Sequence, residues 1–362
     1  MVKETAKVNL KREARRYQYL FSKGQEVIKG ARMPTSVTGA FNAFQKETVN
    51  LDSYRTKSAR SSRDWLVGKI NAFDNFFPLY TDKHISFGSF ARRTKIRPLD
   101  DIDMMIALTG QGCSYSEDGF GKITIHVPDD CDAYKHYRHA SADSLNSIRI
   151  VNEFVRKLSN IDQYKSATIK RNQEAAVLNL KSYDWAFDIV PCFFTTEDAL
   201  GRTFYIIPDG NGYWKKTDPR RDRYRVTNIN TSCSGNMLNV LRLVKYWQKR
   251  PTMPSMGSYL LECMVLNYFE NKGTCSQFQD MELAGVFDYI ANHIFANVPD
   301  PKGIQTNLND KLLYEEREKI YNKATADAIV AKEARNLEND GDHRASINKW
   351  RQIFGNNFPE YG

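Results

Sequence analysis

The spacing of apolar residues changes twice along this chain, and each change marks a different kind of element. Over residues 38–76 apolar side chains recur every three or four positions, which predicts one long helix. From Asp101 to about residue 190 the pattern is that of short strands with polar turns, interrupted by a helix at 141–158. Helical spacing returns from about residue 218. This order predicts an α+β fold, in which a mixed sheet precedes a helical C-terminal lobe.

Shorter signals place the individual elements. The first helix is predicted to bury Phe41, Phe44, Leu51, Trp65, Leu66, Ile70 and Phe73. Strands are predicted at residues 101–108, 165–170, 175–180 and 185–190. The run Asp209-Gly-Asn-Gly212 predicts a tight hairpin. Ser232 or Ser234 is expected to cap a helix that buries Met237, Leu241 and Trp247. Later helices are predicted at residues 258–271, 279–296, 310–336 and 343–353.

We divide the chain into a basic N-terminal arm (1–34), a core that carries the sheet (35–217) and a helical lobe (218–362). The net charge of +9 is concentrated in the arm, since residues 1–33 contain nine Lys or Arg against three Glu, which gives +6. Such a segment can contact nucleic acid, an acidic partner or another protomer. Apolar residues between its charges favour a helix that docks on the body instead. We therefore expect the arm to be dispensable for chemistry, with no nucleic acid required.

Composition excludes several classes of protein. Hydrophobic residues make up 41% of the chain and aromatic residues 12%, which is typical of a globular protein. No apolar run approaches the ~18 residues that cross a bilayer, and the N-terminus lacks the apolar segment of a secretory signal. Six Cys are scattered without the spacing of a disulfide framework. We therefore expect a cytoplasmic protein with reduced thiols and no membrane segment.

The candidate chemistry lies around the acidic pair Asp101-x-Asp103. In a strand, residues two apart share a face, so these carboxylates are expected to point the same way and to repel each other unless a cation lies between them. Carboxylate oxygens are typical ligands of Mg²⁺ and Mn²⁺. The turn at Gly88-Ser89, a dozen residues earlier, can hold phosphate oxygens through backbone N–H groups and a hydroxyl. A phosphate-binding turn beside a metal-binding pair of acids is the minimum that nucleotidyl transfer requires.

Asp188 is the third candidate acid. It is the one polar residue within the apolar strand Phe187–Phe193, and its neighbours Phe187 and Ile189 are expected to face the opposite side. An unpaired carboxylate in that setting costs several kcal/mol, which a bound metal would remove. In two-metal catalysis, an acid in this place serves the ion that activates the attacking hydroxyl and helps to take its proton.

Each of these signals has a plainer interpretation. An Asp-x-Asp pair is common at solvated strand ends, and Asp188 alone could be a buried acid that pairs with an Arg or Lys. Asp100 is expected to have no role, because the alternation of the strand points it away. The conjunction of the turn, the pair and the third acid favours the functional interpretation.

The motifs also carry a family resemblance. The order Gly-Ser-Phe-x-Arg-x-Thr-x-Ile-x-Pro-x-x-Asp-Ile-Asp, followed by Phe-Asp-Ile-Val-Pro, resembles the polymerase-beta-like nucleotidyltransferases. More narrowly, it is similar to the bacterial cGAS-like group, the CD-NTases of anti-phage signalling systems. The resemblance runs from about residue 40 to the C-terminus. Its later motifs are Ile207–Trp214, Leu243–Trp247, Gly257–Glu262, Lys349–Gly355 and Phe358-Pro359.

The resemblance implies a polymerase-beta-like fold and a function. It implies that NTPs, ATP among them, are joined into a cyclic di- or trinucleotide that signals to a downstream effector, with two Mg²⁺ ions (or Mn²⁺) at Asp101, Asp103 and Asp188. It further implies that Lys245 reaches the triphosphate from the helical lobe. Ser258 is expected to assist at a helix N-terminus, and Tyr259 to stack on a nucleobase. The alternatives are nucleotidyl transfer to an RNA end or a small acceptor, and a catalytically inactive nucleotide-binding module.

Two further segments carry hypotheses. Residues 110–141 are rich in Gly and Asp and predict an insertion or loop over the mouth of the site. Some eukaryotic relatives hold zinc in such an insertion, but the His and Cys here fit no standard zinc spacing. The chain ends Phe358-Pro-Glu-Tyr-Gly362, which predicts an extended, exposed tail. By resemblance this tail is a candidate handle for a conjugating or regulatory partner, although a frayed end without a role is the plainer interpretation.

Overall fold

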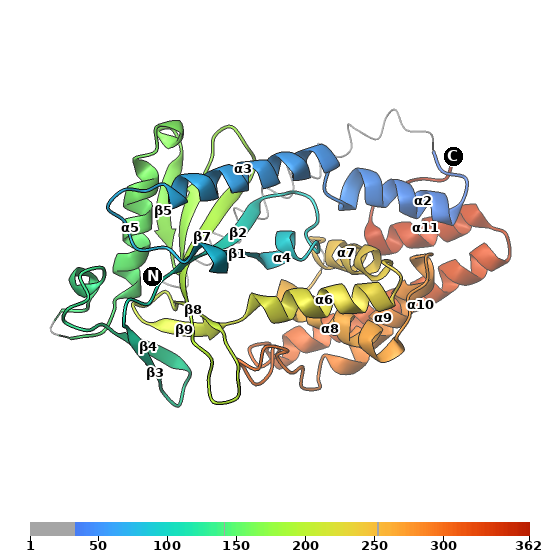
Figure 1. Cartoon of the computed structure of the whole chain (residues 1–362). Helices are drawn as coiled ribbons and strands as arrows, with labels where there is room; N and C mark the ends of the chain where they lie inside the picture. The colour runs from blue at the N-terminus through green and yellow to red at the C-terminus, as the bar shows by residue number, and fades with distance from the viewer. Residues whose placement is uncertain (1–32, 141, 252) are drawn as a thin grey trace.

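The computed structural model describes residues 33–140, 142–251 and 253–362 (Figure 1). The basic arm therefore lies outside the described residues, as do the predictions made for it. Within the described ranges, one sheet contains the strands β1 (Ile85–Phe87), β2 (Asp101–Leu108), β3 (Ser114–Glu117), β4 (Lys122–His126), β5 (Thr168–Asn172), β6 (Ala175–Asn179), β7 (Ala186–Phe194), β8 (Tyr205–Pro208) and β9 (Trp214–Thr217).

The sheet is mixed, as predicted. Its main path runs in the order β1-β2-β7-β8-β9-β4-β3, and the β5–β6 hairpin joins it through β7. The central strands β2 and β7 are parallel, while β1, β6 and β8 pair antiparallel with them. The hairpin predicted at Asp209–Gly212 links β8 to β9. Parallel pairing of β2 with β7 brings segments more than 80 residues apart in the chain to the same edge of the sheet.

Helices flank the sheet and form the second half of the molecule. They are α2 (Val37–Phe44), α3 (Ser53–Asn71), α4 (Gly88–Ala91), α5 (Ser147–Ser159), α6 (Pro219–Ser232), α7 (Met237–Gln248), α8 (Ser258–Lys272), α9 (Asp280–His293), α10 (Tyr314–Asn339) and α11 (His343–Phe354). A π-helical turn follows α2 at Gln45–Val49, and the short 3-10 helix η5 covers Asp162–Tyr164. Among the described residues, no helix combines the length and the apolar character needed to span a membrane.

The two faces of the sheet have different neighbours. From β2, Ile102, Met104 and Ile106 are buried in one hydrophobic cluster with residues of α3 and α5. Because side chains alternate along a strand, Asp101 and Asp103 point to the opposite face. That face lies toward the helical lobe, since Arg92, just after α4, reaches Glu262 of α8.

The helical lobe has a core of its own, and the beginning of the described chain belongs to it. Residues of α6 to α11 are buried together in one cluster, which α2 and the π-helical turn also join. Phe41 packs edge-on against Trp350 at 5.0 Å, and Phe44 against Tyr246 at 4.9 Å between ring centroids. The boundary between residues 217 and 218 remains a prediction, but α2 packs with the lobe that follows that boundary.

The prediction of a single long helix at 38–76 is wrong. The chain leaves helical geometry at Asn50, and α3 begins anew because Asp52 caps it, accepting the backbone N–H of Arg55 at 2.8 Å. An Asp before a helix is a start signal that the apolar spacing alone does not show. Trp65 was expected to be buried, yet it is 41% exposed. It lies on the outer face of α3, away from the buried Leu66.

Three other expectations need correction. The helix predicted from residue 141 begins only at Ser147, where Asn146 caps it. Ser232 does not cap α7, because it is the last residue of α6, a helix that starts at the cap Asp218. The segment 110–141 is not only loop: β3 and β4 extend the sheet. In each case a capping side chain or a strand partner determines the element, and apolar spacing does not report either.

The C-terminal tail is not free in this structure. Phe358 is fully buried against Phe41 and Phe44, with ring centroids 5.0 Å apart in both pairs. The backbone N–H of Gly362 donates to the carbonyl of Pro34 at 3.2 Å. Burial of one Phe side chain contributes about 2 kcal/mol toward holding the tail on the lobe. The expectation of an exposed tail is therefore wrong up to Phe358, although Gly362 itself is exposed.

Candidate active site

The Gly88-Ser89 turn, which forms the start of the short helix α4, lies directly against an acid of β2. Gly88 has a positive φ of 71°, and a Cβ at this position would clash with Oδ2 of Asp103. Glycine is therefore required twice, by the backbone conformation and by the space that the carboxylate fills. The carbonyl of Ser89 accepts the backbone N–H groups of Thr94 and Lys95 at 2.9 and 3.1 Å, which closes the turn. The Gly-Ser part of the sequence motif therefore lies beside the acids in the fold.

The three predicted acids come together at one edge of the sheet. Asp103 of β2 lies directly beside Asp188 of the parallel strand β7, and Phe87 of β1 lies on its other side. Asp101 is paired with Ala186, one step nearer the strand ends. All three acids share the sheet face opposite α3, as their spacing predicted.

The carboxylates of Asp103 and Asp188 are destabilised by burial and by the negative charges around them. Burial raises the pKa of Asp103 to about 7, and the charges of Asp101 and Asp188 add to the rise. The pKa of Asp188 is raised to about 6, again by burial first and by Asp101 second. Each shift means that the fold penalises the ionised carboxylate. A divalent cation at this position would remove the penalty.

Lys95 is a residue that the sequence argument missed. Its ammonium, which is 8% exposed, pairs with the carboxylates of both Asp100 and Asp101. Burial opposes its charge, but Asp101 and Asp100 outweigh burial and raise its pKa. Asp100, for which no role was expected, shares this lysine, and its own pKa is lowered because Lys95 outweighs the effect of burial.

The side-chain types of these acids are those of a divalent-metal site, but their carboxylates do not converge on one point. Across residues 33–140, 142–251 and 253–362, no three His, Cys, Asp or Glu side chains are placed to hold a metal ion as they stand. Asp101 is engaged by Lys95 instead. The donor set nevertheless fits a hard cation, since all three candidates are carboxylates and two of them are destabilised as anions.

The predicted triphosphate ligand Lys245 lies in a buried network that joins the two halves of the site. Glu262 of α8, which is 2% exposed, accepts Arg92 at 3.0 Å, Thr94 at 3.1 Å and Lys245 at 2.5 Å. Burial opposes the charge of Glu262, but Arg92 and Lys245 outweigh it and lower its pKa. Burial lowers the pKa of Lys245. One carboxylate therefore connects the segment after the Gly-Ser turn to α7.

Ser258 and Tyr259 begin α8 on the same side of the lobe. The hydroxyl of Tyr259 donates to Asp222 at 2.6 Å, while the ammonium of Lys302 lies 4.2 Å from its ring centroid. The guanidinium of Arg92 lies 5.9 Å from the same centroid. Burial first, then Cys263, and then Asp222 and Asp300 raise the pKa of the phenol. The structure thus brings Tyr259 to Arg92 and so to the network that holds Lys245.

Three residues of the site that the sequence argument missed, Arg92, Thr94 and Glu262, lie within the quoted sequence motifs. Arg92 and Thr94 are fixed positions of the pattern Gly-Ser-Phe-x-Arg-x-Thr, and Glu262 ends the Gly257–Glu262 motif. An acid among Leu, Cys and Met within a helix predicts a buried partner, in the same way as Asp188 does within its strand. Lys95 had no comparable signal, because a Lys beside a turn is ordinarily solvated.

His126 and His139 of the 110–141 segment have separate partners. His126 contacts the hydroxyl of Ser116 at 2.9 Å and the carboxylate of Asp143 at 3.2 Å. His139 lies 3.0 Å from the carbonyl of Gly212. Among the residues of this segment that the structure describes, no group of three His, Cys, Asp or Glu side chains is placed to hold zinc.

The raised pKa of Asp103 gives a stability prediction. Its ordinary value is 3.8, so the folded chain binds this proton more tightly than the unfolded chain does. Stability is then lost as pH rises from about 4 to about 7. In EDTA, Asp103→Asn should raise the midpoint of thermal unfolding at pH 8, and this gain should shrink steadily toward pH 5. Unfolding scans across this range would show it, and a lower midpoint for the variant at pH 8 would contradict the assigned burial of charge.

The fold and this geometry together define a class. A Gly-Ser turn packed on a mixed sheet, with two acids on one strand and a third on the adjacent parallel strand, is the arrangement of a polymerase-beta-like nucleotidyltransferase. No protein-family model matches the chain. A protein of Bacillus cereus strain VD146, described as a probable cyclic nucleotide synthase, is 44% identical over 334 residues, which cover 91% of this chain and 99% of that protein. The chain belongs to the family of cyclic nucleotide synthases, the CD-NTases.

Other similarities agree with this assignment. The cyclic AMP-AMP-AMP synthase of Acinetobacter sp. strain ATCC 27244 / 9458 is 26% identical over 198 residues, which cover 52% of this chain and 54% of that one. E. coli MS115-1 CdnC, solved with ATP, superposes with a TM-score of 0.63 at 17% identity, covering 88% of this chain and 98% of CdnC. CdnC solved in complex with HORMA-deltaN gives the same TM-score. These two structures support the fold.

Proposed function

We propose that this enzyme is a Mg²⁺-dependent synthase that joins NTPs, ATP among them, into a cyclic di- or trinucleotide signal for bacterial anti-phage defence. The observation that carries the proposal is the lateral pairing of Asp103 with Asp188, beside Asp101 and behind the Gly88-Ser89 turn. The relative described as a cyclic AMP-AMP-AMP synthase supports ATP as a substrate and a product of up to three nucleotides.

Asp101, Asp103 and Asp188 are the residues that would hold two Mg²⁺ ions, or Mn²⁺ in their place. When bound, such ions neutralise charge on the triphosphate and lower the pKa of the attacking hydroxyl. With a pKa of about 6, Asp188 is ionised at neutral pH and can accept a proton from that hydroxyl. Asp101 would exchange Lys95 for the metal, and Lys95 would keep Asp100 as its partner.

The remaining predicted residues are proposed to hold the donor nucleotide. Ser89 offers its hydroxyl at the turn, and Ser258 lies at the N-terminus of α8. Lys245 reaches the triphosphate by sharing or leaving its bond with Glu262. A nucleobase that stacks on Tyr259 would replace Lys302 on that ring or use the opposite ring face.

The proposal extends to the partners and the location of the enzyme. The product would act on a downstream effector, and the protein would work in the cytoplasm without a membrane or a nucleic-acid activator. The complex of CdnC with HORMA-deltaN supports a regulatory protein partner for this chain too. If a conjugating enzyme uses the C-terminus as a handle, Gly362 must first leave its hydrogen bond with Pro34.

Product analysis tests the proposed function against its rival. The chain, incubated with Mg²⁺ and all four NTPs and no other acceptor, should give a cyclic oligonucleotide whose bases and size mass spectrometry identifies. An enzyme that modifies RNA ends or small acceptors would give little product until its acceptor was added. A nucleotide-binding module without activity would release no pyrophosphate under any of these conditions.

A further inference from the structure

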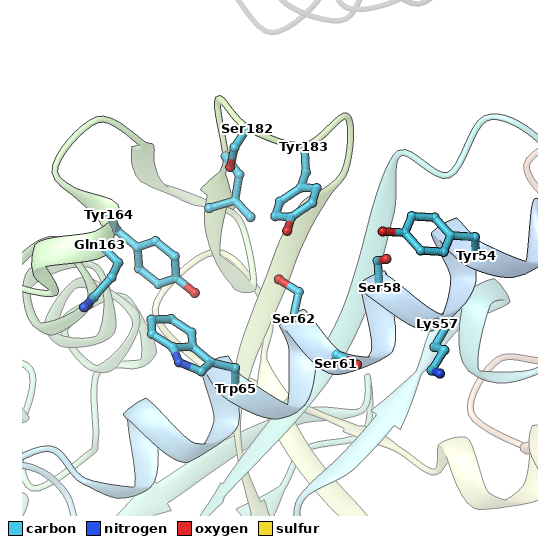
Figure 2. A pocket seen from close by; sticks show the side chains of 11 residues that line it. Tyr54, Lys57, Ser58, Ser61, Ser62, Trp65, Gln163, Tyr164, Ser182 and Tyr183 are labelled. Carbon is cyan, nitrogen blue, oxygen red and sulfur yellow. The ribbon is translucent and has the colours of Figure 1, made fainter.

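A second site, away from the acids, lies on the outer side of α3. A hollow of about 610 Å³ opens between α3, the short helix η5 and the loop that connects β6 to β7 (Figure 2). Its volume falls within the range of small-molecule sites. Because α3 covers the sheet face opposite the three acids, a ligand here would not compete with substrate at the active site.

The α3 wall of this hollow is one continuous face of the helix. Tyr54, Ser58, Ser61 and Trp65 follow at intervals of four, three and four residues, which place them on one side of a helix. Figure 2 shows Tyr164 and Tyr183 extending toward this face from the other two walls. The walls thus offer aromatic rings from three separate segments of the chain.

Two of these rings are held by neighbours while part of their surface stays in contact with solvent. Trp65 packs edge-on against Tyr164 at 5.6 Å between centroids, yet it is 41% exposed. Tyr183 stacks on the buried Trp185 at 4.3 Å, and it is 44% exposed. Rings that neighbours hold in place while part of their surface is exposed can stack on a flat heterocycle with little loss of side-chain entropy.

The polar side chains that line the hollow include one lysine and several serines. In the part of the chain that the structure describes, the hydroxyls of Ser58, Ser61, Ser62 and Ser182 make no hydrogen bond to protein, and Lys57 makes no ion pair. No carboxylate lines the hollow. Of the charged residues of α3, five are Lys or Arg and one is Asp. The chemistry is therefore that of a site for an aromatic, anionic and hydroxyl-rich ligand.

We propose that this hollow binds a nucleotide, with the base stacked on Trp65 and the phosphate held by Lys57 and the serine hydroxyls. Base stacking on aromatic side chains is worth about 1–3 kcal/mol for each base, and a Lys ammonium is a point charge suited to phosphate. The nucleotide is either free or one unit of an oligonucleotide. The inference is independent of the proposed function, since it uses none of the residues of the active site.

Photolabelling with 8-azido-AMP in EDTA tests this site without using catalysis. Label should saturate and should map by mass spectrometry to peptides that contain Tyr54–Trp65, Gln163–Tyr164 or Ser182–Tyr183. Trp65→Ala should reduce this labelling at least tenfold by removing the stacking ring. Ser61→Glu should do the same by placing a carboxylate where the phosphate binds. The exposed position of Ser61 on α3 makes that substitution tolerable to the fold.

Tyr224→Ala is the matched control, because Tyr224 is 71% exposed on α6, outside the hollow. It should leave the labelling unchanged. Competition by unlabelled AMP would identify a free nucleotide as the ligand, and competition only by a short oligoadenylate would identify a nucleotide unit within a chain. Label that does not saturate, that maps only to peptides with Lys245 or Tyr259, or that both Trp65→Ala and Ser61→Glu leave intact would overturn the proposal.

Discussion

Asp103→Asn should lower turnover about a thousandfold or more while the protein stays folded. Metal-supported stabilisation of transition-state charge is worth several kcal/mol, and each ~1.4 kcal/mol is a factor of ten in rate. The amide keeps the shape of the carboxylate beside Gly88 but removes one charge of the triad. The measurement is the rate of Mg²⁺-dependent pyrophosphate release from NTPs at saturating substrate.

The matched control is Asp130→Asn, the same chemical change at an exposed position outside the site. It should leave turnover within about twofold of the unmodified chain, as surface substitutions remote from special features ordinarily do. Near-normal turnover in Asp103→Asn would remove this acid from the catalytic assignment.

Glu262→Gln should cause the largest loss of stability among single changes near the site. It leaves Arg92 and Lys245 buried without their carboxylate. Breaking a buried ion pair from one side costs about 3–5 kcal/mol. Denaturant unfolding should show this loss as a lower midpoint at unchanged m-value.

A second substitution separates the structural part of this effect from the catalytic part. Lys245→Met in the same chain removes one of the stranded cations, so stability should be partly restored. The KM for NTP should rise in this double variant, because Lys245, the proposed triphosphate ligand, has been removed. Glu333→Gln, which breaks a surface pair with Lys349, should cost less than about 1 kcal/mol. Equal losses for Glu262→Gln and Glu333→Gln would argue against the buried network.

Local sequence signals predicted the strand face of Asp101 and Asp103 and the burial of Asp188. Strand alternation placed Asp101 and Asp103 on one face, and the apolar setting of Asp188 predicted a buried acid that needs a partner. Their meeting depends on the parallel register of β2 with β7, which no local signal contains. The family resemblance supplied that step, and the mixed sheet confirms it.

Other features arise from contacts between distant segments, and sequence reasoning could not place them. Lys95 pairs with Asp101 only because the turn after Ser89 folds back toward β2. Glu262 meets Arg92 across 170 residues of chain. The break after Val49 and the burial of Phe358 both depend on how α2 packs into the helical lobe. Apolar spacing reports which face of an element is buried, but not which element covers it.

The most direct test of the central claim is the ratio of pyrophosphate released to nucleotide incorporated. Closing a ring of nucleotides releases one pyrophosphate for every nucleotide and leaves no terminal phosphate. With NTPs and Mg²⁺, this chain is expected to give a ratio of one and a product that resists phosphatase. Asp103→Asn should give neither pyrophosphate nor product. A ratio below one with a phosphatase-sensitive product would show linear transfer instead, and it would contradict the assignment of this chain as a cyclic nucleotide synthase.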